Sequence, residues 1–248
     1  MRGGSIMTGV REASALARAL LDFALPPRCP GCGSITPGDY QFCTTCWLAL
    51  EFLGPPGCIR CNMPMPFEGM ICAPCMDSPP RHDGVHAAVA YGEISRRVTL
   101  RLKYGRRISD ARTMAVLMAR HMAVTPETLV IPVPLHYWRI WQRGYNQSAL
   151  IAGYLVRLQG GTLLPDGLKR VRRTRSLSGL GKKQRAKEVR GAFRVPEVHR
   201  SRIRGAHILL VDDVFTSGAT VNACARVLKA KGAKRVEVIC WARVVHHD

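Results

Sequence analysis

The sequence contains no uninterrupted apolar run of the roughly 18 residues that a transmembrane helix needs, and it contains no GxxxxGK[ST] motif. The first absence predicts a soluble protein, and the second disfavours ATP hydrolysis of the Walker type. Acidic residues are also scarce, because 17 Asp and Glu face 37 Lys and Arg, which gives a formal net charge of +20. With 248 residues, 47% of them hydrophobic, the chain is long enough to bury a sizeable core.

The positive charge is confined to the second part of the chain. Residues 1–80 hold five basic and six acidic residues, whereas residues 81–248 hold 32 basic and 11 acidic residues, a net charge of +21. A surplus of this size favours a polyanionic partner, either nucleic acid or phosphorylated metabolites, because neutralised phosphates release their counterions. A cationic surface that only keeps the protein in solution remains the alternative.

Eight of the ten cysteines lie between Cys29 and Cys75, where the pattern CxxC-x10-CxxC occurs twice. Two thiolates three positions apart on a tight turn converge on one metal ion, and a second such turn completes a tetrahedral set of sulfurs that favours Zn²⁺. Four thiolates leave no open coordination position, so we expect two structural zinc ions. The predicted ligands, paired sequentially, are Cys29, Cys32, Cys43 and Cys46 for one ion and Cys58, Cys61, Cys72 and Cys75 for the other.

Two alternatives to this arrangement stay open. The CxxC turns could share their ions in an interleaved pairing, and eight cysteines could also form a disulfide framework. Paired CxxC turns and the lack of a secretory signal peptide favour metal over disulfides. A segment this short, rich in Pro and Gly, takes much of its folding free energy from the metal.

Composition divides the chain into three predicted regions. Residues 1–27 are predicted to hold an amphipathic helix over residues 11–25 that ends before two prolines. Docking of this helix on the protein's own surface is the simpler interpretation, and membrane association is the alternative. Residues 28–80 are predicted to form a double zinc ribbon, and residues 81–248 a separate domain.

In residues 81–248, short apolar strands alternate with helical patterns, which predicts an α/β fold with an open, mostly parallel sheet and helices on its faces. Ligands of such sheets bind beyond the carboxyl ends of the strands. The predicted strands cover residues 85–91, 128–134, 162–168, 206–211 and 235–241, and the predicted helices cover residues 109–122, 146–159 and 219–231.

The segment VDDVFTSGAT (residues 211–220) joins a buried strand to the start of a helix. The carboxylates of Asp212 and Asp213 can accept hydrogen bonds from the vicinal hydroxyls of a sugar. The following turn offers hydroxyl donors, a glycine and a helix N-terminus, all of which favour a phosphate group. The segment therefore predicts a site for a phosphorylated ribose. The residues of the turn are Thr216, Ser217, Gly218, Ala219 and Thr220.

VDDVFTSGAT resembles the phosphoribosyl pyrophosphate (PRPP) loop of type I phosphoribosyltransferases. Together with the CxxC turns and the segments IPVPLHYWRIWQRGYNQS (131–148) and RRTRSLSGLGKKQRAKEVRGAF (172–193), the match extends over nearly the whole chain to the ComF family of competence-related proteins. This resemblance implies a double zinc ribbon joined to a type I phosphoribosyltransferase domain that binds PRPP with Mg²⁺. It also implies a cytoplasmic role in passing single-stranded DNA toward recombination, with helicase or recombination proteins as partners. The predicted helix over residues 11–25 leaves peripheral inner-membrane association open.

The resemblance assigns the catalytic and ribose-binding roles to Asp212 and Asp213, and the binding of the 5′-phosphate to residues 216–220. The backbone of Val133, Pro134 and Leu135 is a candidate contact for pyrophosphate, because this segment follows a predicted strand where such domains place their pyrophosphate loop. If the next segment is helical, two arginines lie on one face of it, suited to hold a phosphate or to line a hood over the site, with plain surface arginines as the alternative. These are Arg139 and Arg143.

Residues 169–190 hold ten basic residues and one acid, which predicts a mobile cationic loop. In the related transferases such a loop closes over PRPP and its magnesium ion and excludes water. The same run suits the backbone of a nucleic acid, and a solvated cationic face remains the plain alternative. The candidate residues for closure are Arg172, Arg173 and Arg175, and those for extended nucleic-acid contacts are Lys182, Lys183, Arg185, Lys187 and Arg190.

Three functional hypotheses follow. The first is a PRPP-dependent glycosyltransferase of nucleotide metabolism with an unidentified acceptor; purine salvage is in doubt, because Thr216 stands where transferases of the hypoxanthine type carry an acid. The second is a protein of natural transformation that handles single-stranded DNA and uses the transferase fold to sense PRPP or as an inherited scaffold. In the third, the zinc ribbons dock a partner protein. Cys224 and Cys240 are expected in the core.

Overall fold

The computed structural model describes residues 26–105, 107–174 and 181–245, apart from the side chains of Lys182 and Lys183. The predicted helix over residues 11–25 and the candidate residue Arg175 lie outside the described residues. The contacts of the chain divide it into two compact units, Met1–Ala49 and Leu50–Asp248. Composition thus changes near residue 80, whereas the contacts separate the chain between the two predicted zinc ribbons.

The described part of the first unit consists of turns and one short helix. Gly33 N–H donates to the carbonyl oxygen of Cys29 at 2.9 Å, and Cys29 N–H donates to that of Ser34 at 2.8 Å. Gly33 has a φ of 85°, which glycine adopts at little cost. Helix α2 (Thr44–Leu48) begins directly after Cys43. The turn and the start of the helix bring the first two CxxC pairs together.

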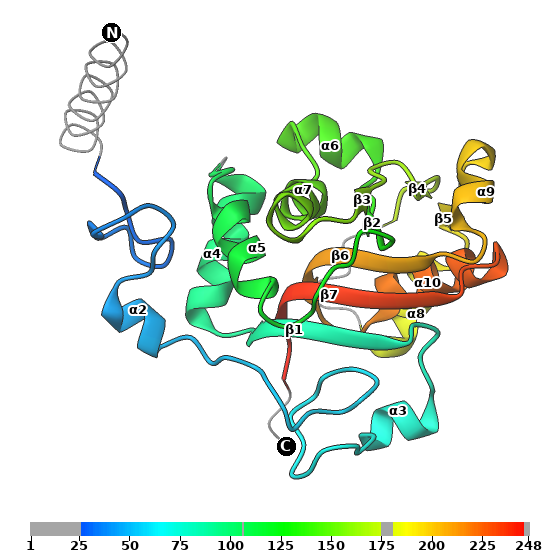
Figure 1. The fold of residues 1–248 in the computed structure, drawn as a ribbon, viewed down its shortest axis with the longest axis horizontal. Coiled ribbons are helices and arrows are strands. Elements are labelled where there is room, and N and C mark those ends of the chain that lie inside the picture. The colour runs from blue at the N-terminus through cyan, green and yellow to red at the C-terminus, as the bar shows by residue number, and fades with distance from the viewer. Residues whose placement is uncertain (1–25, 106, 175–180, 246–248) are drawn as a thin grey trace, which may run out of the picture. The chain divides into compact units, whose positions relative to one another are not determined.

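The second unit holds a sheet of five strands in the order β1-β7-β6-β2-β3 (Figure 1). All neighbouring strands in it are parallel, which confirms the predicted open α/β sheet. A separate antiparallel pair is formed by β4 and β5. The strands are β1 (Gly84–Ala90), β2 (Leu129–Pro132), β3 (Thr162–Leu163), β4 (Lys169–Arg170), β5 (Phe193–Arg194), β6 (His207–Phe215) and β7 (Arg235–Arg243).

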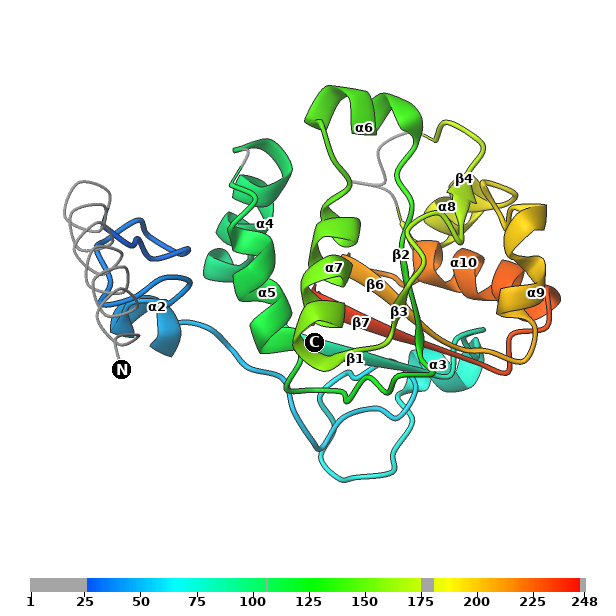
Figure 2. The same ribbon diagram turned by 45° about the horizontal axis from the view of Figure 1, so that its top comes forward.

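Helices cover both faces of the five-stranded sheet (Figure 2). The helices α4 (Glu93–Tyr104), α5 (Asp110–Met118) and α7 (Gln147–Gln159) lie on one face, and α10 (Ala219–Ala230) with α8 (Lys182–Val189) lies on the other. In the part of the chain that the structure describes, no helix is long and apolar enough to cross a membrane. The remaining helices are α3 (Ala73–Asp77), α6 (Tyr137–Arg143), η1 (Glu197–His199) and α9 (Arg200–Ile203).

The central strands are apolar on both sides because both faces of the sheet are covered. On β6, Ile208 and Leu210 pack in the core beneath α10, and the alternate residue Leu209 is also fully buried. Cys224 on α10 and Cys240 on β7 have no exposed surface, which confirms their predicted place in the core. The apolar run Ile208–Val211 is therefore buried at every position, instead of alternating between buried and exposed residues.

The second cysteine-rich segment packs on the sheet. Leu53 N–H donates to the carbonyl oxygen of Ala88 at 3.0 Å, and Ala90 N–H donates to that of Glu51 at 2.8 Å, so residues 51–53 run antiparallel to the outer edge of β1. The Asn62 side chain accepts a hydrogen bond from Ala87 N–H at 2.9 Å. Residues 50–80 thus belong to the same compact unit as the α/β domain.

Several element boundaries differ from the sequence prediction. Strand β6 continues through both aspartates to Phe215, because this central strand stays paired with β7 as far as the register Phe215 to Arg243. The strand predicted over residues 162–168 stops at Leu163, just before the turn that contains Pro165 and Gly167. Helix α8 occupies part of the predicted cationic loop, and helix α4 was not predicted at all.

Candidate functional site

The carboxyl end of β6 and the start of α10 bring the candidate ribose and phosphate residues together. Asp212 and Asp213 lie on β6, and Gly218 is the N-terminal cap of α10. A small pocket is enclosed by Asp212, by Val214 and Phe215, and by residues 216–221. The predicted turn and the first predicted acid therefore face one shared space at the edge of the sheet where α/β proteins bind ligands.

The turn depends on a glycine at position 218. Gly218 has a φ of 72°, and a Cβ atom there would lie 2.8 Å from Cζ of the Phe215 ring, so any other residue would collide with that ring. The hydroxyl oxygen of Ser217 is buried and has no hydrogen-bond partner among the described residues. A buried hydroxyl in this state is suited to donate to a ligand oxygen.

Asp212 is held in place by two donors. Ser148, at the start of α7, donates to Asp212 Oδ1 at 3.2 Å, and the Asp213 N–H donates to the same oxygen at 2.9 Å. Burial and the neighbouring charge of Asp213 raise the pKa of Asp212 to about 7. Asp212 therefore changes charge near neutral pH, and a bound cation such as Mg²⁺ would favour its ionised form.

Asp213 forms an ion pair with a lysine that the sequence analysis missed. Lys103 Nζ on α4 lies 2.7 Å from Asp213 Oδ2, and both side chains are largely buried. Burial alone would lower the pKa of Lys103, but the attraction of Asp213 outweighs it and raises that pKa. The apolar repeat Ile94, Val98 and Leu102 could have predicted the helix. It could not have indicated which acid the lysine meets 110 positions later.

The segment Val133, Pro134 and Leu135 leaves the sheet directly beside β6. Val133 N–H donates to the carbonyl oxygen of Val211 at 2.9 Å, and the side chain of Asn146 donates to the carbonyl oxygen of Val133 at 3.0 Å. The segment is thus fixed next to the aspartate pair. Its contact with pyrophosphate stays a prediction.

The segment that carries Arg139 and Arg143 is helical, as the prediction required, but the two side chains have different neighbours. Arg139 lines a cavity of about 970 Å³. Arg143 donates to Gln147 at 3.1 Å and lies over the ring of Tyr104 at 5.1 Å. Burial and the charge of Arg143 lower the pKa of Arg139.

The candidate loop residues are spread over two places. Arg172 donates to the carbonyl oxygens of Glu188 and Arg190 at 2.6 and 2.9 Å, which fastens the start of the loop to the end of α8. Arg172 and Arg173 both line the cavity beside α6. Arg185 lines a different cavity, together with Thr216, Ser217 and Gly218. The side chains of Lys187 and Arg190 are exposed.

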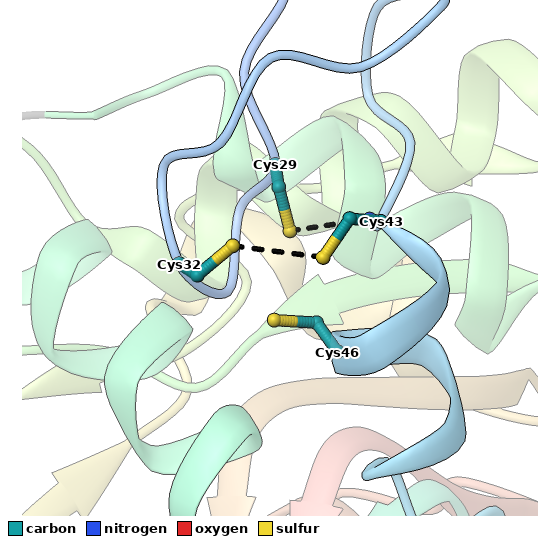
Figure 3. Close-up of side chains that lie close together, drawn as sticks. All are labelled: Cys29, Cys32, Cys43 and Cys46. Atoms are coloured by element: carbon teal, nitrogen blue, oxygen red, sulfur yellow. Dashed lines mark hydrogen bonds between the residues drawn. The ribbon is translucent and has the colours of Figure 1, made fainter.

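The eight cysteines form two clusters with the predicted sequential pairing (Figure 3 shows the first). Within each cluster all four Sγ atoms lie within 4.8 Å of one another. The distances from Cys32 to Cys43 and from Cys61 to Cys72 are both 3.6 Å. Zinc–sulfur bonds of about 2.3 Å in a tetrahedron require sulfurs about 3.8 Å apart. The clusters therefore fit two structural zinc ions, and none of the cysteines forms a disulfide.

Backbone N–H groups that donate to the sulfurs also support two metal sites. The N–H groups of Gly31 and Cys43 both donate to Cys29 Sγ at 3.3 Å, and Cys72 N–H donates to Cys58 Sγ at 3.4 Å. Donors aimed at sulfur stabilise the thiolate form that a metal requires.

The second cluster lies close to the turn that begins α10. A cavity of about 430 Å³ is bounded by Cys61, Cys72 and Cys75 on one side and by residues 215–218 on the other. The buried side chain of Arg243 donates to the carbonyl oxygen of Cys61 and lies over the Phe215 ring, 5.3 Å from its centre. Arg243 thus contacts both the second cysteine cluster and the Phe215 ring that lies beside Gly218.

Comparison with known families and proteins agrees with this architecture. The double zinc ribbon domain family matches residues 20–76, and the phosphoribosyl transferase domain family matches residues 162–246. Competence protein F of Haemophilus influenzae is 31% identical over 177 residues, which cover 68% of this chain and 76% of that protein. DNA utilization protein YhgH of Salmonella typhi is 32% identical over 178 residues, which cover 69% of this chain and 77% of that protein.

Among solved structures, the allosteric regulatory enzyme of purine biosynthesis aligns with a TM-score of 0.35 and 21% identity, over 52% of this chain and 25% of that chain.

Proposed function

Because the chain belongs to the ComF family, we propose that it binds PRPP with Mg²⁺ at the carboxyl edge of β6 and handles single-stranded DNA during DNA uptake. The names of the two relatives, Competence protein F and DNA utilization protein, support the DNA-related part of this proposal. The same reasoning proposes a cytoplasmic place of action, with helicase or recombination proteins as partners.

The observation that carries the PRPP proposal is the pairing of two adjacent aspartates, one buried and one partly buried, with a hydroxyl-rich turn at one edge of the sheet. The aspartates would hold the ribose hydroxyls and the turn would hold the 5′-phosphate, with the buried Ser217 hydroxyl as one donor. The ionised aspartates and the pyrophosphate would share Mg²⁺, which offsets their negative charges. Lys103 Nζ, 2.7 Å from Asp213 Oδ2, would hold the Asp213 side chain in position.

Calorimetric titration of the zinc-loaded protein with PRPP and Mg²⁺ tests this site. We expect micromolar binding, and we expect the double variant Asp212→Asn/Asp213→Asn to bind at least about a hundredfold more weakly, because it loses both charged acceptors. The matched control, Asp39→Asn/Asp166→Asn, removes the same charge at two exposed positions and should bind as the unmodified protein does. Equal affinity of the site variant and the control would refute the proposal.

The raised pKa of Asp212 adds a pH dependence. Its ionised fraction rises about tenfold between pH 6 and pH 8 if its pKa is about 7. The affinity for PRPP with Mg²⁺ should therefore increase by up to about tenfold over this range, beyond the change caused by the phosphates of PRPP itself. Titrations of Asp212→Asn at the same pH values supply that reference, and identical slopes for the two proteins would contradict the assignment.

The raised pKa of Asp212 also determines how the stability of the protein changes with pH. The folded-state pKa of Asp212 lies above its unfolded value of about 3.9, so its contribution to stability is greatest at acid pH and is lost as the pH rises through about 7. The Asp212→Asn variant used above should thus melt at a higher temperature than the unmodified protein at pH 8, but not at pH 4.

A second function, binding of single-stranded DNA, is favoured by the net charge of +21 on residues 81–248. Fluorescence anisotropy with a labelled oligothymidylate should show binding that weakens steeply with salt, because phosphates and counterions exchange. Binding without salt dependence, or none at all, would remove this function and leave a PRPP-dependent glycosyltransferase of nucleotide metabolism as the better explanation.

A further inference from the structure

Helix α6 exposes an unusual amount of aromatic surface. Two of the four tryptophans in the sequence lie on this helix. The exposed fractions are 63% for Tyr137, 48% for Trp138 and 80% for Trp141, and no residue of the helix is buried. Aromatic side chains gathered on a surface commonly mark a binding site, because each contributes a large apolar area with few rotatable bonds. The exposed rings of α6 are therefore suited to bind a ligand that has flat apolar surfaces.

The rings of α6 form a continuous row. The ring centres of Trp138 and Trp141 lie 5.9 Å apart with an interplanar angle of 88°, and those of Tyr137 and Trp138 lie 5.5 Å apart at 32°. His136 continues the row, with its ring centre 4.3 Å from that of Tyr137. Trp138 and Trp141 are three positions apart and so share one side of the helix. Their edge-to-face contact does not cover both rings, which leaves ring surface open to a third planar group.

The cavity beside these rings is strongly cationic. It measures about 970 Å³, and both tryptophans contribute to its wall. Four arginines line it against a single acid, Glu188, and the charge of Arg139, after burial, lowers the pKa of Arg170. Positive charges that repel one another in this way are stabilised by an anionic ligand. The four arginines are Arg139, Arg170, Arg172 and Arg173.

A polar group inside the cavity also lacks a partner. His136 is 8% exposed, and its Nδ1 atom has no hydrogen-bond partner among the described residues. Buried ring nitrogens are normally paired with protein groups or water. His136 Nδ1 is therefore available to exchange a hydrogen bond with a polar edge of a ligand.

Planar surfaces, several negative charges and polar edges occur together in a single strand of nucleic acid. In a duplex the base faces are covered by their neighbours, whereas in a single strand they can stack on exposed aromatic rings. Arginines in a groove suit the phosphates that link the bases. A lone phosphate would use the arginines but leave the tryptophans without a role.

We propose that Trp138 and Trp141 stack on the bases of single-stranded DNA whose phosphates lie against Arg139, Arg170 and Arg173. This assignment rests on the single-stranded DNA function proposed above and gives it a location. His136 directly follows the segment Val133–Leu135, so the bound strand would run beside the candidate pyrophosphate contact. The binding site is thus distinct from the phosphate turn but adjoins the same edge of the sheet.

The test compares two labelled 15-nucleotide probes by fluorescence anisotropy: oligothymidylate, and an abasic strand with the same phosphates but no bases. The unmodified protein should bind oligothymidylate at least about tenfold more tightly than the abasic strand. Trp138→Ala and Trp141→Ala should each weaken binding of oligothymidylate by about tenfold and leave binding of the abasic strand unchanged. Trp141→Phe should retain part of the affinity, because a phenyl ring still stacks.

Two further variants complete the experiment. Phe67→Ala removes an aromatic ring that is 73% exposed elsewhere in the second unit and should bind both probes normally. Arg173→Ala should weaken the binding of both probes by the same factor. It should also reduce the slope of log affinity against log salt concentration by about 1, because one phosphate contact is lost. An unchanged circular dichroism spectrum and an unchanged melting temperature show that each variant is folded.

The outcomes separate the two proposals. If the unmodified protein binds oligothymidylate but also binds the abasic strand equally well, or if the tryptophan variants bind as the unmodified protein does, stacking on α6 is refuted while the DNA function stands. If the unmodified protein does not bind oligothymidylate, the DNA function itself fails.

Discussion

The two cysteine clusters repeat one ligand spacing in different surroundings. In the first, Cys32 is exposed and Cys43 is partly exposed. In the second, Cys58, Cys61 and Cys72 are each at most 7% exposed and pack in the core that also contains Val236 of β7. The same metal geometry is thus used once in a unit of its own and once as part of a larger hydrophobic core.

The residues between the CxxC turns explain this difference. In the second repeat, Met63, Met65 and Ile71 pack against the core of the α/β domain. In the first repeat, Ile35 is 65% exposed and Tyr40 is 38% exposed. Ligand spacing therefore determines where the metal binds, whereas the intervening side chains determine whether the ribbon becomes part of the neighbouring domain.

Substitution of one ligand at the same position of each repeat is the strongest way to test this comparison. Cys61→Ser should lower the melting temperature of the α/β unit by about 10 °C or more, because loss of a structural zinc site removes several kcal/mol of folding free energy. Cys32→Ser should shift that transition by no more than about 2 °C. Scanning calorimetry with zinc analysis checks both variants. Equal shifts would show that the two ribbons support the domain in the same way.

Each ribbon also accepts a hydrogen bond from one arginine, which gives a second, smaller contrast. Arg243 is 4% exposed and donates to Cys61 O, whereas the exposed Arg28 donates to Gly33 O at 3.1 Å. Arg243→Met should cost about 2–3 kcal/mol, because it leaves a buried carbonyl unpaired and removes the cation over Phe215. Arg28→Met should cost less than about 0.5 kcal/mol. Urea unfolding measures both, and a cost for Arg243→Met as small as that for Arg28→Met would count against the proposed link to Phe215.

The smallest contrast concerns the residue that follows the CxxC turn in each repeat. Gly33 and Asn62 both have positive φ, at 85° and 58°, but only the second position carries a side chain, which accepts a hydrogen bond from Ala87 N–H of β1. Asn62→Gly should cost about 1 kcal/mol, because the lost hydrogen bond outweighs the easier backbone conformation.

The reciprocal change serves as its control. Gly33→Asn should stay within about 0.5 kcal/mol, because asparagine tolerates this conformation and no atom lies within 4 Å of a Cβ added there. Urea unfolding of the zinc-loaded protein measures both variants. A larger cost at Gly33 than at Asn62 would contradict the assigned role of the Asn62 side chain.

The sequence was sufficient for features that depend on local chemistry. Two CxxC turns ten residues apart bring four sulfurs together whatever surrounds them, so both clusters could be predicted, and the structure confirms the sequential pairing over the interleaved alternative. The run Ile208–Val211 followed by two acids and a hydroxyl-rich turn likewise predicted that strand, turn and helix follow one another here. The clustering of these residues at the edge of β6 agrees with that prediction, while their ligands stay proposed.

Features that depend on distant partners could not be predicted. Lys103 meets Asp213 only because α4 packs on the sheet, and nothing near either residue in the sequence indicates the pair. The extension of β6 to Phe215 depends on pairing with β7, which comes later in the chain. The attachment of residues 51–53 to β1 likewise requires a strand edge more than thirty positions away.

That attachment has a consequence for the behaviour of the protein in a crowded solution. A parallel sheet has two outer strands, and an uncovered outer strand is a template on which other chains can add themselves. Here one outer strand, β3, spans only Thr162–Leu163, and the other, β1, is paired at its carboxyl end, residues 88–90, with residues 51–53. Residues 51–53 therefore shield this edge of the sheet from pairing with other chains, and a chain that lost this segment would be more prone to self-association.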